Sequence, residues 1–179
     1  VKFLAEAVRH DPSSVQRFDR EWKMASAIDS PHVVRMIARG ETPDGLPYIV
    51  MELLEGESLE ERVERHGKLE PDAAITIFRQ VASALDRAHA LGIVHRDIKP
   101  ENILLCGPES RVKILDFGLA KPFATDGFSL TKTGVLMGTP FYMAPEQIKQ
   151  GGRDFDGRAD HWALAAVAYR TLLGVQPFD

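Results

Sequence analysis

The stretch HRDIKPEN, residues 95–102, decides how the rest of the chain is arranged around it. It follows Gly92, where a predicted helix stops, and it precedes a short β-prone run, so its polar side chains should lie on a connecting loop. Catalytic groups are commonly mounted on loops that a rigid scaffold holds in place. Because five positions separate Asp97 from Asn102, one loop can present a carboxylate to a hydroxyl and an amide oxygen to a metal ion.

A second polar element, Asp116-Phe117-Gly118, comes after the next β-prone run. Its glycine frees the backbone, and its aspartate offers a hard oxygen ligand of the kind that suits Mg²⁺. A single triplet of this type is a weak signal. Its weight depends on the other motifs that accompany it.

Three segments have the apolar period of a helix. Residues 13–28 begin with two serines that are candidate caps, residues 71–90 stop before Gly92, and residues 158–173 read as a largely buried helix that ends at Gly174. The apolar positions that carry the first two patterns are Val15, Phe18, Trp22, Ala25, Ile77, Val81, Leu85 and Ala88.

The first part of the chain is rich in short β-prone runs. Residues 33–37 and 48–53 flank Thr42-Pro43-Asp44-Gly45, whose proline and glycine suit the backbone angles of a tight turn, so we expect a hairpin. With residues 1–4 as a third strand, residues 1 to about 52 should form a small sheet that carries one helix.

Later segments are less regular. Residues 103–105 and 112–115 predict a second small hairpin around Gly107-Pro108. The stretch from 116 to 157 has little periodicity, and a stretch of that length without regular structure is usually functional or disordered. The acidic residues from 55 to 64 are interpreted as a solvated face without a function.

Composition sets the broad class. The 179 residues, 44% apolar and 27% charged, suffice for one globular domain. A net charge of −4 without a basic run argues against a nucleic-acid partner. The single cysteine, Cys106, is expected to pack in the interior of a cytoplasmic protein. The longest apolar stretch, 162–168, is too short for a membrane helix, and no secretory signal or initial methionine is present, so the chain is interpreted as part of a longer one.

The motifs, taken together and in order, resemble the signature set of eukaryotic-like (Hanks-type) serine/threonine protein kinases, with a style similar to the bacterial members. The resemblance covers essentially all 179 residues. It implies an α+β, two-lobe fold, with a small β-rich lobe at 1–52 and a mainly helical lobe at 53–179. The matching positions are Lys2, Glu21, residues 95–102, Asp116-Phe117-Gly118, Ala144-Pro145-Glu146 and Asp160.

The resemblance implies a reaction that uses ATP and Mg²⁺ to phosphorylate protein hydroxyls. Asp97 resembles the catalytic base, while Asn102 and Asp116 resemble the magnesium ligands. Lys99 resembles the lysine that meets the γ-phosphate in serine/threonine kinases, and Thr139 would bond both Asp97 and Lys99. The alternative is that the two aspartates merely cap loops.

The same resemblance outlines the nucleotide site. Lys2 resembles the lysine that holds the α- and β-phosphates, and Glu21 its ion-pair partner; the alternatives are a frayed terminal charge and a solvated helix residue. Such an exposed pair is expected to form only intermittently.

Residues 48–54 resemble the hinge between lobes, with Met51 as gatekeeper, backbone groups of Glu52 and Leu54 at the adenine edge, and Leu104 on the floor. Plain core packing is the alternative for Met51.

Supporting residues follow from the family as well. His95 and Phe117 are expected to pack and align the site, and Asp160 to accept backbone hydrogens from residues 95–102. Thr131 and Thr133 align with activation-loop threonines, whose phosphates could pair with Arg96.

Two family elements are missing from the chain, namely the glycine-rich loop before Lys2 and the final helices after Asp179, so the chain taken alone is expected to be a poor enzyme. The rival interpretations are a pseudokinase and a small-molecule phosphotransferase. A pseudokinase is disfavoured because Lys2, Asp97 and Asp116 are all present. A small-molecule enzyme would lack the stretch at 138–146 that builds a platform for protein substrates.

Overall fold

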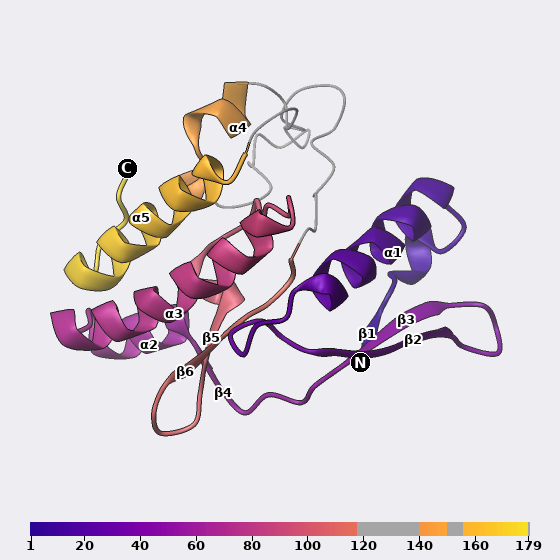
Figure 1. Ribbon diagram of the computed structural model, residues 1–179, viewed down its shortest axis with the longest axis horizontal. Coiled ribbons are helices and arrows are strands. Elements are labelled where there is room, and N and C mark those ends of the chain that lie inside the picture. Colours follow the sequence, from indigo (N-terminus) through magenta and orange to yellow (C-terminus); the bar gives the residue numbers. More distant parts are fainter. Residues whose placement is uncertain (118–139, 150–155, 179) are drawn as a thin grey trace.

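The computed structural model describes residues 1–117, 140–149 and 156–178, and it divides them between two small sheets and their helices (Figure 1). The first sheet has the order β1-β3-β2, formed by β1 (Lys2–Phe3), β3 (Pro47–Met51) and β2 (Met36–Glu41). Both pairings are antiparallel, with Lys2 opposite Ile49 and Gly40 opposite Tyr48. This β-rich part beside a mainly helical part confirms the predicted α+β class.

The predicted hairpin is present, with one of its strands displaced. The amide of Thr42 donates to the Leu46 carbonyl at 3.0 Å, and Gly45 has a φ of 81°, so the turn falls where proline and glycine predict it. The strand expected at 33–37 instead occupies 36–41. Val33 forms an isolated bridge with Ile114 in the second sheet, because its apolar side chain is buried there.

The helix beside the first sheet is α1 (Pro12–Ala27), which follows the short turn η1 (Glu6–Val8). Its cap is Asp11, whose carboxylate accepts from the amides of Ser13 and Ser14, and the serines expected as caps lie inside the first turn. A carboxylate also suits the partial positive charge at a helix start.

The second sheet has the order β4-β5-β6 and contains the other predicted hairpin. Its strands are β4 (Gly56–Ser58), β5 (Ile103–Cys106) and β6 (Arg111–Ile114). The acidic stretch 55–64 contains β4 and the helix α2 (Leu59–His66). The solvated face expected there is present at Glu55, Glu61 and Glu64, which are exposed, whereas Glu57 and Glu60 are half-buried. Ser58 and Glu61 form a reciprocal capping box, and the apolar side of α2 is buried through Leu59 and Val63.

Two long helices form the body of the larger part, α3 (Pro71–Ala90) and α5 (Arg158–Leu173), which contact one another (Figure 1). Short elements complete it: η2 (Pro100–Asn102), η3 (Pro140–Tyr142) and α4 (Pro145–Lys149). The last two show that the stretch 116–157 contains regular structure. The helix α5 is less buried than expected, since Trp162, Tyr169 and Leu173 are exposed.

Within the part of the chain that the structure describes, no helix has both the length and the apolar character needed to cross a membrane.

The end of α5 generates a stability prediction. Gly174 has a φ of 76°, and a Cβ there would lie 2.3 Å from the carbonyl oxygen of Gly67. We expect Gly174→Ala to lower the free energy of unfolding by more than the ~1–2 kcal/mol of left-handed backbone strain alone. Gly45→Ala is the matched control, because Gly45 has a φ of 81° with open space around it. Urea unfolding of both variants measures the difference, and equal losses would contradict the predicted clash.

Candidate active site

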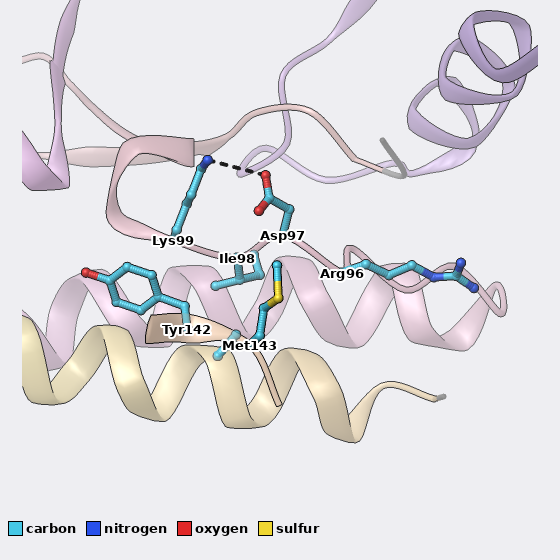
Figure 2. Close-up of a pocket in the computed structure, with 7 residues that line it drawn as sticks. Arg96, Asp97, Ile98, Lys99, Tyr142 and Met143 are labelled. Atoms are coloured by element: carbon cyan, nitrogen blue, oxygen red, sulfur yellow. Dashed lines mark ion pairs between the residues drawn. The ribbon is translucent and has the colours of Figure 1, made fainter. Parts of the chain in front are cut away.

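The loop at 95–102 lies between α3 and β5 and brings Asp97, Lys99 and Asn102 together. The Asn102 Nδ2 donates to the backbone carbonyl of Asp97 at 2.8 Å and to its Oδ2 at 3.2 Å. Lys99 Nζ lies 3.5 Å from the same Oδ2, and Figure 2 shows these two side chains facing one another. Because a carbonyl can only accept, Nδ2 is the donor, and Asn102 Oδ1 remains as an acceptor for another ligand.

A buried carboxylate on α5 holds this loop in shape. Asp160 is 1% exposed and accepts from the amides of His95 and Arg96, each at 2.8 Å. Its Oδ2 also lies 2.8 Å from His89 Nε2. Burial of a carboxylate is costly unless hydrogen bonds replace its hydration, and here both oxygens have partners. The expectation that Asp160 accepts backbone hydrogens from the loop is confirmed.

Arg96 adopts a left-handed backbone conformation, with a φ of 71°. Such a conformation costs energy for a residue with a side chain, and the surroundings must hold it. Gln147, which is 2% exposed, donates from Nε2 to the Arg96 carbonyl at 3.0 Å and accepts from the Ala144 amide at 2.9 Å. Sequence reasoning missed Gln147, for which the only signal was its place directly after Ala144-Pro145-Glu146.

His95 is a buried packing and hydrogen-bonding element. Its Nε2 donates to the Leu115 carbonyl at 2.9 Å, and its Nδ1 accepts from the Asp97 amide at 3.2 Å. The ring meets that of Phe117 edge to face, with centroids 4.6 Å apart. Both ring nitrogens are therefore occupied, and the predicted packing role of His95 and Phe117 is confirmed.

Three charged side chains from distant segments meet beside the loop. Lys2 Nζ lies 2.6 Å from Glu21 Oε1 and 2.8 Å from Asp116 Oδ1. The pair of Lys2 and Glu21 is present, although the expectation of an exposed contact is wrong, because Glu21 on α1 is 1% exposed. Asp116 has a φ of 56°, so the backbone at this position is also held in a left-handed conformation.

Burial and ion pairing both shift the pKa values of the residues in this cluster. Burial alone lowers the pKa of Lys2, but the hydrogen bonds to Asp116 and Glu21 outweigh it and hold that pKa above its ordinary value. Burial raises the pKa of the Glu21 carboxyl, and the hydrogen bond and positive charge of Lys2 oppose this only in part. Lys2 therefore stays an ammonium ion between two carboxyl groups.

The side chains of Asp116 and Asn102 offer the type of ligand atom that a magnesium ion prefers. Each supplies a hard oxygen, and the Asn102 amide is fixed so that its oxygen is the group left to coordinate. Among the described residues, no cluster of three or more His, Cys, Asp and Glu side chains could hold a metal by itself. Magnesium is commonly held by one or two protein oxygens together with phosphates and water, and such a site needs no larger cluster.

The residues expected around adenine are divided between the two sheets and the segment that joins β3 to β4. Met51 ends β3, and Leu104 on β5 stands opposite Ser58 and Lys113 in the register of the second sheet. Among the described residues, neither the Glu52 carbonyl nor the Leu54 amide has a backbone hydrogen-bond partner. Both groups can therefore bind a planar ligand edge. Met51 is half-buried, a position that suits side-chain packing as well as contact with a ligand.

A small pocket lies directly beneath Asp97 and Lys99, between the loop and α5 (Figure 2). The pocket is lined by Arg96, Asp97, Ile98, Lys99, Tyr142, Met143 and Ala163. Burial raises the pKa of Tyr142 to about 12, so this side chain stays a neutral hydroxyl, and it donates to Gln176 at 3.1 Å.

Three threonines named from the sequence lie outside the described residues. They are Thr139, which is expected to bond Asp97 and Lys99, and the expected phosphorylation sites Thr131 and Thr133.

The contacts of Asp160 predict the effect of its amide isostere. Asp160→Asn replaces one acceptor oxygen by an amino group, which leaves a buried backbone amide without an acceptor. We expect the free energy of unfolding to fall by about 1–3 kcal/mol. Asp86→Asn, at an exposed position on α3, is the control and should change stability little. Wild-type stability of Asp160→Asn in chemical denaturation would show that these bonds do not hold the loop.

Comparison with known proteins covers the whole chain. A model described as the protein kinase domain matches residues 1–179. The serine/threonine-protein kinase PknB of Mycolicibacterium smegmatis is 41% identical over 181 residues, which cover 99% of this chain and 28% of the relative. For PknE of Mycobacterium bovis the identity is 40%, covering 100% of this chain and 31% of the relative. For pkn3 of Myxococcus xanthus it is 38%, covering 100% and 33%.

Structural comparison agrees. The crystal structure of the Mycobacterium tuberculosis PknI kinase domain superposes with a TM-score of 0.74 at 33% identity, covering 99% of this chain and 63% of that one. The chain thus spans 28% to 33% of the length of these curated bacterial relatives. The fold, the order of the motifs and the match over all 179 residues lead to one conclusion: this chain belongs to the protein kinase domain family.

Proposed function

We propose that this chain is the catalytic domain of a serine/threonine protein kinase, with residues 1–52 as its small lobe and 53–179 as its large lobe. The single observation that carries the proposal is the meeting of two groups. Asp97 and Asn102 are hydrogen-bonded on one loop, and Lys2, Glu21 and Asp116 form one charged cluster. The Leu115 amide, next to Asp116, donates to the Asn102 carbonyl at 2.9 Å and joins the two groups. The ligands are ATP with Mg²⁺ and a protein that bears a serine or threonine hydroxyl.

The chemistry proposed for the loop is the transfer of a phosphoryl group. The substrate hydroxyl oxygen forms a bond to the γ-phosphorus of ATP, and the bond from that phosphorus to the bridging oxygen breaks, so that ADP leaves. Asp97 orients the hydroxyl and accepts its proton, while Lys99, 3.5 Å from the Asp97 carboxylate, offsets charge on the transferred group. Thr139 is proposed to tie the segment that binds the substrate to these two residues.

Positioning of the phosphates is assigned to the charged cluster. Lys2, oriented by Glu21, binds the α- and β-phosphate oxygens, because an ammonium held in place loses little freedom when an anion arrives. Asp116 and Asn102 hold Mg²⁺, which neutralises phosphate charge when bound. The Lys2–Asp116 contact has to open for both residues to reach their ligands. The family relationship and the donor types support these assignments.

The adenine ring is assigned to the junction between the sheets. The Glu52 carbonyl and the Leu54 amide bind its polar edge, Met51 limits the depth of the site and Leu104 contacts its face. A requirement for ATP and one unpaired thiol, Cys106, favour a cytoplasmic location for this part of the protein.

The test compares two variants of the full chain encoded by the gene, given labelled ATP and a generic basic protein. Asp97→Asn should lower turnover by at least ~10², the contribution of a positioned base, with nucleotide affinity little changed. Asp116→Ala should instead weaken nucleotide binding in the presence of Mg²⁺, because a metal ligand is lost.

Two results would contradict the assignment. Near-wild-type turnover of Asp97→Asn removes Asp97 from its role, and wild-type nucleotide affinity that is the same with and without Mg²⁺ removes Asp116 from its role. Nucleotide binding without any transfer would identify a pseudokinase. Label on a small acceptor alone would identify a small-molecule phosphotransferase.

Regulation by self-phosphorylation is the second part of the proposal. A phosphate on Thr131 or Thr133 adds nearly two negative charges and three acceptor oxygens, which a guanidinium such as that of Arg96 can bind. We expect mass spectrometry of the active enzyme to find phosphate on at least one of these threonines, and replacement of both by alanine to lower activity several-fold. An unmodified segment in the active enzyme, or full activity of the double variant, would overturn this part.

A further inference from the structure

Lys113 on β6 stands where three segments of the site converge. Its side chain is 13% exposed, and its Nζ lies 2.5 Å from Glu52 Oε1 and 3.4 Å from the Val33 carbonyl. Glu52 follows β3 in the proposed adenine-binding segment, and Lys113 precedes Asp116 by three residues. One ammonium group therefore bridges the adenine-binding segment and the strand that leads to the proposed magnesium ligand.

The Glu52 carboxylate extends this contact to the segment after α1. Its Oε1 also accepts from the Arg35 amide at 2.8 Å, and the Glu52 amide donates to the Arg35 carbonyl at 3.0 Å. A carboxylate that receives an ammonium and a backbone amide on one oxygen makes charge-assisted bonds of the stronger type. Arg35 is thereby joined to the adenine-binding segment through both its backbone and the Glu52 side chain.

The segment after α1 is also fastened directly to β6. The Val34 amide donates to the Ile114 carbonyl at 3.0 Å, and the Ile114 amide donates to the His32 carbonyl at 2.8 Å. Val33 and Ile114 are 2% and 0% exposed and form a parallel bridge. This segment directly follows α1, the helix that carries Glu21, and β6 precedes Asp116. The hydrogen bonds between the segment and β6 therefore help to fix the position of Glu21 relative to Asp116.

The ionic state of the pair follows from its surroundings. Burial alone would raise the pKa of Glu52, but the hydrogen bonds from Lys113 and the Arg35 amide outweigh it and bring that pKa below its ordinary value. Glu52 therefore stays a carboxylate. Loss of Lys113 leaves that carboxylate partly buried without its cation, and the segments around it then relax to rehydrate it.

From these contacts we infer that Lys113 and Glu52 form a positioning lock: their ion pair holds the adenine-binding segment, the segment after α1 and the strand before Asp116 in one arrangement, and so sets the affinity for nucleotide. The inference rests on the proposed function for the identity of the ligand. Neither side chain needs to touch the nucleotide. ATP must meet the Glu52 and Leu54 backbone, Lys2 and Asp116 at once, and an arrangement that is formed beforehand lowers the cost of binding.

The test measures nucleotide affinity and turnover separately, in the full chain encoded by the gene. Lys113→Met should raise the KM for ATP and the Kd for a fluorescent ATP analogue about five-fold or more, while turnover at saturating ATP changes less. Lys113→Arg keeps the charge and should restore most of the affinity. Lys68→Met, at an exposed lysine near the end of α2, is the control and should match wild type.

A second variant keeps the test decisive if Lys113→Met fails to fold. Glu52→Gln preserves the shape and an acceptor for the Arg35 amide but removes the charge, and it should weaken nucleotide binding in the same direction. Since both variants break one pair, the double variant Glu52→Gln/Lys113→Met should bind nucleotide about as well as the weaker single variant.

Several outcomes would overturn the lock. The first is an unchanged nucleotide affinity in Lys113→Met or in Glu52→Gln. The second is a loss of nucleotide affinity in Lys113→Arg as large as that in Lys113→Met. The third is a double variant whose loss of affinity is the product of the two single fold-changes. The binding measurement also separates this inference from the proposed function. A wild-type protein that binds the ATP analogue but transfers no phosphate contradicts the kinase proposal, and its variants still test the lock.

Discussion

The fixed shape of the loop at 95–102 depends on the buried Asp160 carboxylate. The carboxylate accepts a hydrogen bond from the His95 amide on one oxygen and from the Arg96 amide on the other. A neutral side chain would satisfy these two donors less well, because both oxygens of a carboxylate are strong acceptors. With those amides held, Arg96 keeps its left-handed backbone, and His95 faces Leu115 and Phe117. The loop and the strand end at Asp116 are thus parts of one hydrogen-bonded unit.

A second constraint is the meeting of charges beside that unit. Lys2 comes from the first strand, Glu21 from α1 and Asp116 from the segment directly after β6, and the contacts between them span 19 and 114 residues of sequence. An ammonium ion is only partly covered here, and the two carboxyl groups compensate for the water it loses. This electrostatic compensation holds the pKa of Lys2 above its ordinary value, so that Lys2 stays charged beside the loop.

Two segments that join the sheets, one after β3 and one after α1, both contact Lys113. The segment proposed to bind adenine runs from β3 toward β4, while residues 28–35 run from α1 along β6 to β2. Lys113 contacts both through Glu52 and Val33. Because loops between lobes have fewer contacts than core elements, one partly buried ion pair can influence how the lobes sit.

Apart from the role of Asp160, which followed from the family resemblance, the sequence by itself determined the features that depend on local chemistry: the period of α3, the turn at 42–45 with its glycine, and the polar loop at 95–102. It failed where short elements carry little apolar signal, as in β4 and α2, whose buried face comes from Leu59 and Val63 within an acidic stretch. Only the tertiary structure decided that Lys2 contacts Asp116, that Gln147 holds Arg96, and that Lys113 pairs with Glu52. These contacts join segments from 51 to 114 residues apart, and the geometry that aligns them arises only when both sheets and both long helices are packed.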